Sequence, residues 1–182
     1  MTGRAKILIT GSHGFQGSEF IRLLNARGIA FVRFDRNAAK LPDDFDSVVH
    51  FGGITPVSAT PRAAYTDYHR ANVEGTKRLL GLLANRKLKR LVNIGSAAEY
   101  GVSPRPFREG AAEKPVTSFG KSKLAQSRLI EAFAAKTGVP TINLRIFNIA
   151  GLRARRAPGE SALTRRAASA RSCRKGPRGH PS

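Results

Sequence analysis

The chain has few of the residues that build disulfides, metal centres and membrane spans. Its 182 residues include one cysteine, Cys173, so neither an intramolecular disulfide nor a cysteine-based metal site can form. No segment approaches the roughly 18 consecutive apolar residues that cross a bilayer. Residues 1–6 lead directly into a strand pattern, without the apolar stretch and cleavage site of a secretory signal. These absences predict a cytoplasmic protein that binds neither a metal nor a membrane.

Acidic residues are also scarce, since 12 Asp and Glu stand against 32 Lys and Arg, for a net charge of +20. Residues 152–182 carry eight of these net charges and contain no aromatic residue, valine or isoleucine. We therefore expect a disordered basic tail behind a folded domain at residues 1–151. Such a tail can bind nucleic acid nonspecifically. Nucleic acid is nevertheless disfavoured as a partner, because the other dense basic cluster, residues 86–90, falls at an expected helix end, where the macrodipole favours cations.

A glycine-rich stretch near the start organises the chain. The apolar run at residues 5–9 leads into Gly11, Gly14 and Gly17, and helical apolar spacing follows from Phe15 onward. This pattern predicts a strand, a tight turn and a helix. Without Cβ atoms such a turn lets backbone N–H groups approach a pyrophosphate, and the helix directs its positive end at the charge. Glycine turns also join strands to helices for packing alone, so phosphate binding is a first hypothesis.

An acid follows the second strand pattern. Residues 29–34 read as a strand that ends at Asp35. In a dinucleotide-binding fold, an acid at this position accepts hydrogen bonds from the adenosine ribose hydroxyls. It also repels a 2′-phosphate and so favours NAD over NADP, although Arg33 and Arg36 keep NADP open. The alternative is a loop aspartate that happens to stand at a strand end.

The rest of the chain alternates strand and helix patterns. Expected strands are residues 47–51, 91–94 and 141–146, and expected helices are residues 61–83 and 119–136, the latter stopped by Gly138. Only about ten residues separate Asp35 from the third strand, so this link is stripped down or lacks a full βα unit. The alternation predicts an α/β fold with a doubly wound parallel sheet covered on both faces. Ligands are expected at the carboxyl ends of its strands.

Seven blocks along the chain carry a resemblance to a known family. They are T-G-S-H-G-F-Q-G at 10–17, F-D-R at 34–36, V-V-H-F-G-G at 48–53, N-V-E-G-T at 72–76, I-G-S-A-A-E-Y-G at 94–101, S-F-G-K-S-K at 118–123 and L-R-I-F-N-I-A-G at 144–151. In this order the chain resembles the extended short-chain dehydrogenase/reductases, and within them the NAD-dependent epimerase/dehydratase group that acts on nucleotide sugars. The resemblance implies a Rossmann-like fold and oxidation of a sugar hydroxyl by bound NAD. Epimerisation, dehydration or reduction would follow.

The resemblance also implies roles for individual residues. The implied cofactor contacts are Gly11, Gly14, Phe15, Gln16 and Gly17 at the pyrophosphate, Asp35 and Arg36 at the adenosine ribose, Phe51, Gly52 and Gly53 at a strand end, and Asn72 and Lys123. Ser96 matches the serine that hydrogen-bonds the reacting sugar oxygen, and Asn148 matches a residue near the sugar nucleotide. Lys123 matches the lysine that holds the nicotinamide ribose and lowers the pKa of a tyrosine four residues before it.

That tyrosine position holds Phe119 here. Phenylalanine keeps the ring but lacks the proton-accepting oxygen, and losing a general base typically costs about 10²–10⁴ in rate. Tyr65, Tyr68, Tyr100, His13 and His50 offer no convincing replacement. We therefore expect weak or no activity, and the alternative is a non-catalytic dinucleotide-binding sensor or scaffold.

Two further departures concern larger segments. At residues 35–46 the family has an additional helix and strand with an acid that touches the adenine, so this wall of the cofactor pocket is expected to be missing or rebuilt. After Gly151 the family continues into a substrate-binding lobe, which we expect to be missing here. The tail would then follow a frame slip or a truncation, or be a native extension. The resemblance also implies a possible homodimer through the helices at residues 61–83 and 119–136.

Overall fold

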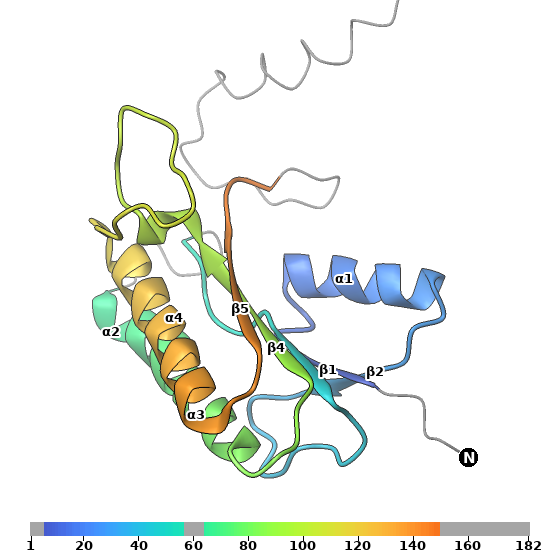
Figure 1. The fold of residues 1–182 in the computed structure, drawn as a ribbon. Coiled ribbons are helices and arrows are strands. Elements are labelled where there is room, and N and C mark those ends of the chain that lie inside the picture. The colour runs from blue at the N-terminus through green and yellow to red at the C-terminus, as the bar shows by residue number, and fades with distance from the viewer. Residues whose placement is uncertain (1–5, 57–63, 150–182) are drawn as a thin grey trace, which may run out of the picture.

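A five-stranded parallel sheet forms the centre of the computed structural model, which describes residues 6–56 and 64–149 (Figure 1). The strands are β1 (Ile7–Thr10), β2 (Phe31–Phe34), β3 (Ser47–His50), β4 (Arg90–Ser96) and β5 (Thr141–Ile146), in the order β2-β1-β3-β4-β5. The chain leaves β1 for β2 on one side and then crosses to β3 on the other side. The order therefore reverses at β1, and ligands of such sheets bind beyond the strand ends at this point.

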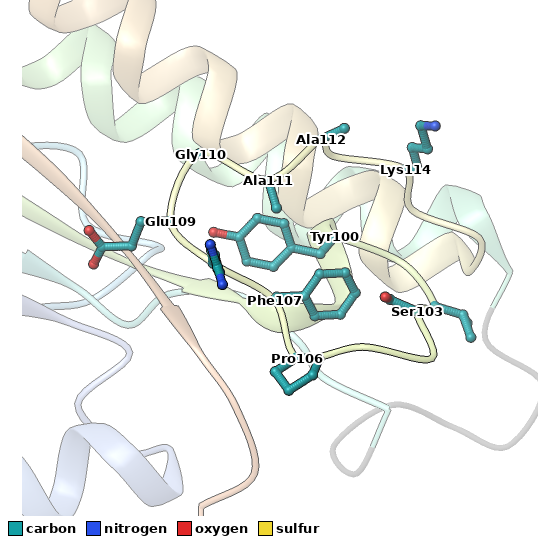
Figure 2. A pocket seen from close by; sticks show the side chains of 11 residues that line it. Tyr100, Ser103, Pro106, Phe107, Glu109, Gly110, Ala111, Ala112 and Lys114 are labelled. Carbon is teal, nitrogen blue, oxygen red and sulfur yellow. The ribbon is translucent and has the colours of Figure 1, made fainter.

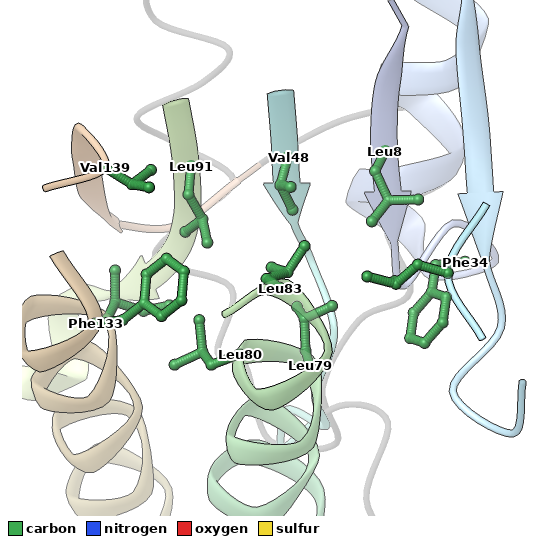
Figure 3. Close-up of a cluster of buried hydrophobic side chains, with 11 residues drawn as sticks. Leu8, Phe34, Val48, Leu79, Leu80, Leu83, Leu91, Phe133 and Val139 are labelled. Atoms are coloured by element: carbon green, nitrogen blue, oxygen red, sulfur yellow. The ribbon is translucent and has the colours of Figure 1, made fainter. Parts of the chain in front are cut away.

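The helices pack on the sheet through two separate apolar clusters. On one face, α1 (Phe15–Ala26) packs Ile21 and Leu24 against Ile9 of β1. On the other face, α3 (Gly75–Leu83) and α4 (Ser118–Thr137) form the larger cluster shown in Figure 3. Its members are Leu8, Phe34, Leu41, Val48, Leu79, Leu80, Leu83, Leu91, Ile130, Phe133 and Val139. The predicted doubly wound parallel sheet is thus confirmed.

Coverage of the sheet by helices is incomplete at β5. Asn143 and Arg145 of this strand bond to residues on the α4 side, so Ile142 and Leu144 point to the opposite face. These two side chains are 53% and 45% exposed. The expectation of a sheet covered on both faces therefore fails at this edge within the described residues.

The helix expected at residues 61–83 is interrupted. Residues 61–63 lie outside the described part of the chain, and the rest forms α2 (Tyr65–Tyr68), a π-helical segment η1 (His69–Glu74) and α3. A π-helical turn holds more residues than an α-turn, so a search for a 3.6-residue period cannot detect it. The segment buries Asn72, whose side chain bonds to other parts of the chain instead of facing solvent.

The link at residues 35–46 contains neither a helix nor a strand, which confirms that it lacks a βα unit. Leu41 anchors it in the core. Arg78 of α3 donates to two backbone carbonyls of the link. Arg86 donates to two further carbonyls of the link and to the Asp43 carboxylate, at distances of 3.0–3.3 Å. Two guanidinium groups thus hold the link where a helix would otherwise pack.

Local signals set the ends of α4 much as the sequence predicts. The Thr117 hydroxyl accepts from the backbone N–H of Gly120 at 2.9 Å, and Gly138 ends the helix at a φ of 71°. The left-handed conformation is the one glycine adopts without strain. No helix in the described segments is long and apolar enough to cross a bilayer. The basic tail at residues 152–182 and Cys173 lie outside these segments.

Candidate functional site

The glycine-rich turn forms an open helix start at the carboxyl end of β1. Gly11 has a φ of 65°, and Gly14 caps α1 without any side-chain hydrogen bond. A Cβ added to Gly17 would lie 2.3 Å from the Gly11 carbonyl oxygen. The glycines thus let backbone segments of the turn approach one another closely, and no acid stands in the first turn of α1. The residues present fit a pyrophosphate, because the helix start is positive and carries no side-chain cap.

The close packing of this turn predicts a large effect of one methyl group. We expect Gly17→Ala to lower the free energy of unfolding by about 1–3 kcal/mol, because the new Cβ meets rigid backbone. Gly81→Ala is the matched control, since a Cβ there meets nothing within 4 Å and alanine favours a helix by up to about 1 kcal/mol. Urea unfolding followed by circular dichroism measures both. Equal stability of the two variants would contradict the packing argument.

A buried histidine fixes the neighbouring strand end at β3. The His50 ring is 2.6 Å from the Thr10 hydroxyl, which also accepts from the backbone N–H of Gly52 at 3.1 Å. A Cβ on Gly52 would lie 2.7 Å from the ring. Burial, helped by the charge of Lys123, lowers the pKa of His50 to about 3. His50 is thus neutral near pH 7 and supports the Gly52 turn.

Asn72 connects that turn to α4. Its amide oxygen accepts from the Ile54 backbone N–H at 2.7 Å, and its amide nitrogen donates to the Ser122 hydroxyl at 2.9 Å. A Cβ on Gly53 would lie 2.5 Å from the Asn72 oxygen. The structure thus gives Asn72 a role in holding residues 52–54, and its contact with a cofactor stays a prediction.

Lys123 lies in the same region and is only 7% exposed. Its ammonium group donates to the Ile94 carbonyl at 2.7 Å and to the Gln126 amide oxygen. Burial lowers the pKa of Lys123 to about 8, against the opposing effect of the Glu99 charge. Lys123 therefore supplies a cation, held from two sides, near the carboxyl end of β4.

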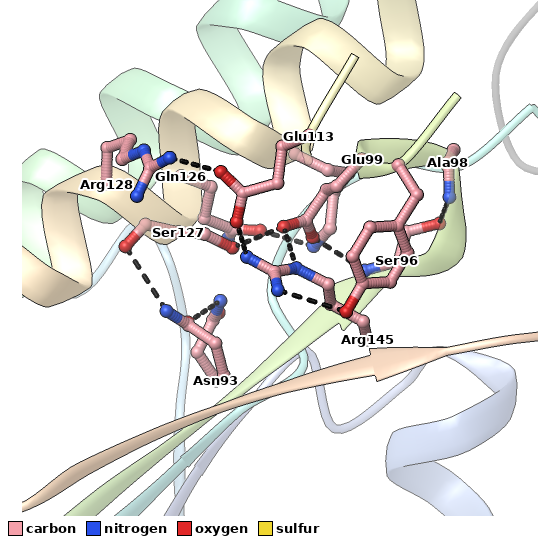
Figure 4. A network of polar contacts seen from close by, with 12 residues as sticks. Asn93, Ser96, Ala98, Glu99, Glu113, Gln126, Ser127, Arg128 and Arg145 are labelled. Atoms are coloured by element: carbon pink, nitrogen blue, oxygen red, sulfur yellow. Dashed lines mark hydrogen bonds and ion pairs between the residues drawn. The ribbon is translucent and has the colours of Figure 1, made fainter. Parts of the chain in front are cut away.

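Ser96 ends β4 and starts the short η2 helix (Ala97–Glu99). Its backbone N–H donates to the Glu99 carboxylate at 2.8 Å, and its hydroxyl accepts from the Ala98 N–H at 3.2 Å (Figure 4). Glu99 is fully buried and also accepts from the Ser127 hydroxyl and from Arg145, both at 2.9 Å. The sequence analysis missed this role of Glu99. The S-x-x-E spacing from Ser96 is a capping-box signal that could have found it.

Phe119 stands in the first turn of α4, and its ring packs against Tyr68 at a centroid distance of 5.7 Å. The remaining tyrosines have other contacts. Tyr100 stacks on Phe107 at 5.0 Å and bonds to Arg145 at 3.2 Å, and Tyr65 packs against a histidine. The expectation that no other tyrosine replaces the missing phenol stays a prediction.

The remaining predicted site residues lie toward the surface. Asp35 is exposed, and its carboxylate accepts from the Asn37 backbone N–H at 2.8 Å, while Arg36 and Asn148 are also exposed. Phe15, Gln16 and Phe51 are half-buried around the glycine turn. The structure therefore brings the glycine turn, the β3 end and the β4 end to one edge of the sheet. Asn148 follows β5 at the end of the described residues.

A separate pocket of about 530 Å³ lies in the loop at residues 100–114 (Figure 2). Tyr100 and Phe107 line it together with other residues of the loop, and it includes none of the predicted site residues. The carboxyl edge of the sheet is the better candidate site. The glycine turn and the buried polar residues Asn72 and Lys123 lie there, and none of them lines the loop pocket. The described residues contain no cluster of three or more His, Cys, Asp or Glu that could hold a metal ion.

Comparisons with known proteins identify the family of this chain. The model of the NAD dependent epimerase/dehydratase family matches residues 7–177. UDP-glucose 4-epimerase from Streptomyces lividans is 36% identical over 176 residues, which cover 80% of this chain and 53% of that protein. The same enzyme from Azospirillum brasilense is 29% identical over 175 residues, with coverage of 80% and 49%. The chain thus spans about half the length of the curated relatives it matches.

A solved structure supports the same fold. MoeE5 in complex with UDP-glucose and NAD superposes with a TM-score of 0.73 at 26% identity, covering 83% of this chain and 57% of that chain. The resemblance stated from the seven sequence blocks is confirmed by these matches.

Proposed function

The chain belongs to the NAD-dependent epimerase/dehydratase family, and from this membership we propose that it binds NAD and a nucleotide sugar at the carboxyl edge of its sheet. The observation that carries the proposal is the glycine turn, in which Gly11 has a φ of 65°, Gly17 packs closely against the Gly11 carbonyl and the start of α1 has no side-chain cap. Such a helix start suits a pyrophosphate, because its backbone N–H groups and positive dipole end attract an anion.

Each end of a bound dinucleotide has a candidate partner. The backbone of residues 11–17 would hold the pyrophosphate, and Asp35 would accept from the adenosine ribose. Lys123 would donate to the nicotinamide ribose, as its buried ammonium and position near the β4 end support. When bound, NAD would supply a hydride acceptor for a sugar carbon. Asp35 favours NAD, while the exposed Arg36 beside it leaves NADP as the weaker alternative.

The nucleotide sugar would lie beside Ser96 and Asn148. The Ser96 hydroxyl is only half-buried at the β4 end, so it remains available to a sugar oxygen. The neighbour MoeE5 binds UDP-glucose and NAD together, which supports a nucleotide sugar as the second ligand. We further propose a cytoplasmic homodimer with contacts through the helical segments at residues 61–83 and 119–136, as the resemblance implies.

Phe119 favours a second candidate function, that of a non-catalytic dinucleotide-binding sensor or scaffold. No oxygen at this position can take a proton from the sugar hydroxyl. The retained Lys123 and Ser96 favour the enzyme, since a binding module does not need both groups. On balance we propose an epimerase/dehydratase-type site with weak or absent turnover.

Calorimetric titration with NAD, and separately with NADP, tests the binding proposal. We expect micromolar NAD binding that Asp35→Ala weakens about tenfold or more, because hydrogen bonds to a charged group contribute about 1.5–3 kcal/mol. Asp44→Ala is the matched control. It removes an acid from the same link, where Asp44 pairs with Lys6 at the surface. If neither NAD nor NADP binds, the proposed function is overturned.

A further inference from the structure

A chain of buried polar side chains crosses the protein between α4 and the sheet. Gln126, His50, Thr76 and Thr10 are each at most 5% exposed. They lie under the carboxyl edge and come from four elements, namely α4, β3, α3 and β1 in the order just given. None of them is among the predicted cofactor or substrate contacts. Burying four polar groups is costly unless their hydrogen bonds are made, so each of them needs a partner inside the protein.

The orientation of the Gln126 amide follows from Lys123, whose ammonium can only donate. Its bond to Gln126 therefore fixes the amide oxygen toward the lysine. The Gln126 amide nitrogen then faces the other way, 3.0 Å from the His50 Nε2 and 2.9 Å from the Thr76 hydroxyl. The Thr76 hydroxyl accepts from this amide nitrogen and donates its own proton to the Asn72 carbonyl at 2.7 Å.

His50 extends these contacts to β1. Its Nδ1 lies 2.6 Å from the Thr10 hydroxyl, which accepts from the Gly52 N–H, and its Nε2 lies 2.9 Å from the Thr76 hydroxyl as well as 3.0 Å from the Gln126 nitrogen. The one proton of the neutral ring donates to Thr10 in one tautomer and to Thr76 in the other. In both tautomers polar contacts run without interruption from Lys123 to the Gly52 turn.

The electrostatic surroundings of Lys123 are equally defined. Glu99, on η2, is the acid that raises its pKa, and the Ile94 carbonyl of β4 accepts one of its protons. His50 of β3 is neutral, because burial and the nearby ammonium both disfavour its protonation. Gln126, three residues further along α4, thus supplies the side-chain dipole that stabilises the ammonium in place.

We propose that Gln126 is a positioning residue, which holds the Lys123 ammonium at the carboxyl edge and ties it through neutral His50 to the Thr10–Gly52 contact. The importance of this position for NAD rests on the proposed function. The hydrogen-bond chain itself can be tested in the full chain without added NAD.

The first experiment measures the pKa of Lys123 by NMR of ¹³C-labelled lysine in the full chain without NAD. We expect Gln126→Leu to lower the pKa by about one unit, because the ammonium loses an acceptor in a buried place. We expect Gln126→Glu, which has the same size, to raise it by about one unit or more. Glu131→Gln is the matched control at an exposed position of the same helix and should leave the pKa unchanged.

A second measurement needs no variant. Nitrogen NMR of labelled His50 in the wild-type chain should show a neutral ring between pH 5 and pH 8, because burial and the Lys123 charge disfavour its protonation. A protonated ring in this range would overturn the neutral link, and equal pKa shifts of Lys123 in the two Gln126 variants would overturn the positioning role. This keeps the inference falsifiable even if Gln126→Leu fails to fold.

NAD titration of folded Gln126→Glu separates the inference from the proposed function. If the wild-type chain binds no NAD while the lysine and histidine measurements agree with expectation, the proposed function fails and the positioning chain stands. If NAD binds but the pKa of Lys123 is the same in the wild-type chain and in the Gln126 variants, the positioning role is overturned.

Discussion

Replacing Arg145 with leucine should lower the free energy of unfolding by about 3–5 kcal/mol, because it leaves a buried carboxylate without its cation. Arg145 pairs with Glu99, which is fully buried, and with Glu113, and it also donates to the Tyr100 hydroxyl (Figure 4). Burial disfavours the cation, yet the bond to Glu99 and the other contacts raise the pKa of Arg145 above its usual range. Arg145 therefore stays charged throughout the neutral pH range.

Urea unfolding with a matched arginine control measures this effect. Arg128 also pairs with Glu113, but its side chain is 59% exposed, so Arg128→Leu should cost at most about 1 kcal/mol. The double variant Glu99→Leu/Arg145→Leu should regain part of the stability that Arg145→Leu loses, since it removes both charges. If Arg145→Leu and Arg128→Leu cost the same, burial of Glu99 is not the source of the effect.

The parts of the site that depend on neighbouring residues could be predicted from the sequence. The strand, glycine turn and helix at residues 7–26 form because each signal lies within a few residues of the next. The same holds for α4, where Thr117 and Gly138 mark the two ends. The seven blocks then placed these elements in a known order, so the fold and the candidate cofactor edge followed.

The parts that depend on long-range contacts could not be predicted. Gln126 reads as one polar position on a helix, and only the fold brings it within hydrogen-bond distance of His50, 76 residues away. The support of the short link by Arg78 and Arg86 is similar, since a surface arginine and a structural arginine look alike in a sequence. The π-helical segment η1 escaped because its turns do not follow the ordinary helical period.

Phe119→Tyr carries the largest expected effect on activity. The ring already has its place against Tyr68 and is half-buried, so the added hydroxyl needs no repacking of a closed core. The phenolate would take the proton from the sugar hydroxyl while a hydride leaves the sugar carbon for NAD. The Lys123 ammonium would lower the phenol pKa toward neutrality, as a nearby cation does. We expect the rate of NAD reduction with a UDP-sugar to rise about 10²–10⁴-fold.

Absorbance of reduced NAD and chromatography of the sugar product would measure this rate for the wild-type chain and the variant. Tyr65→Phe, at an exposed tyrosine that packs against His69, should leave the rate unchanged. Adding Lys123→Met to Phe119→Tyr should abolish the gain, because the phenol then loses the cation that lowers its pKa. If Phe119→Tyr binds NAD and the sugar nucleotide as calorimetry measures but transfers no hydride, the retained Ser96 and Lys123 do not form a working site. The binding module, rather than the silenced enzyme, would then be the correct description of this chain.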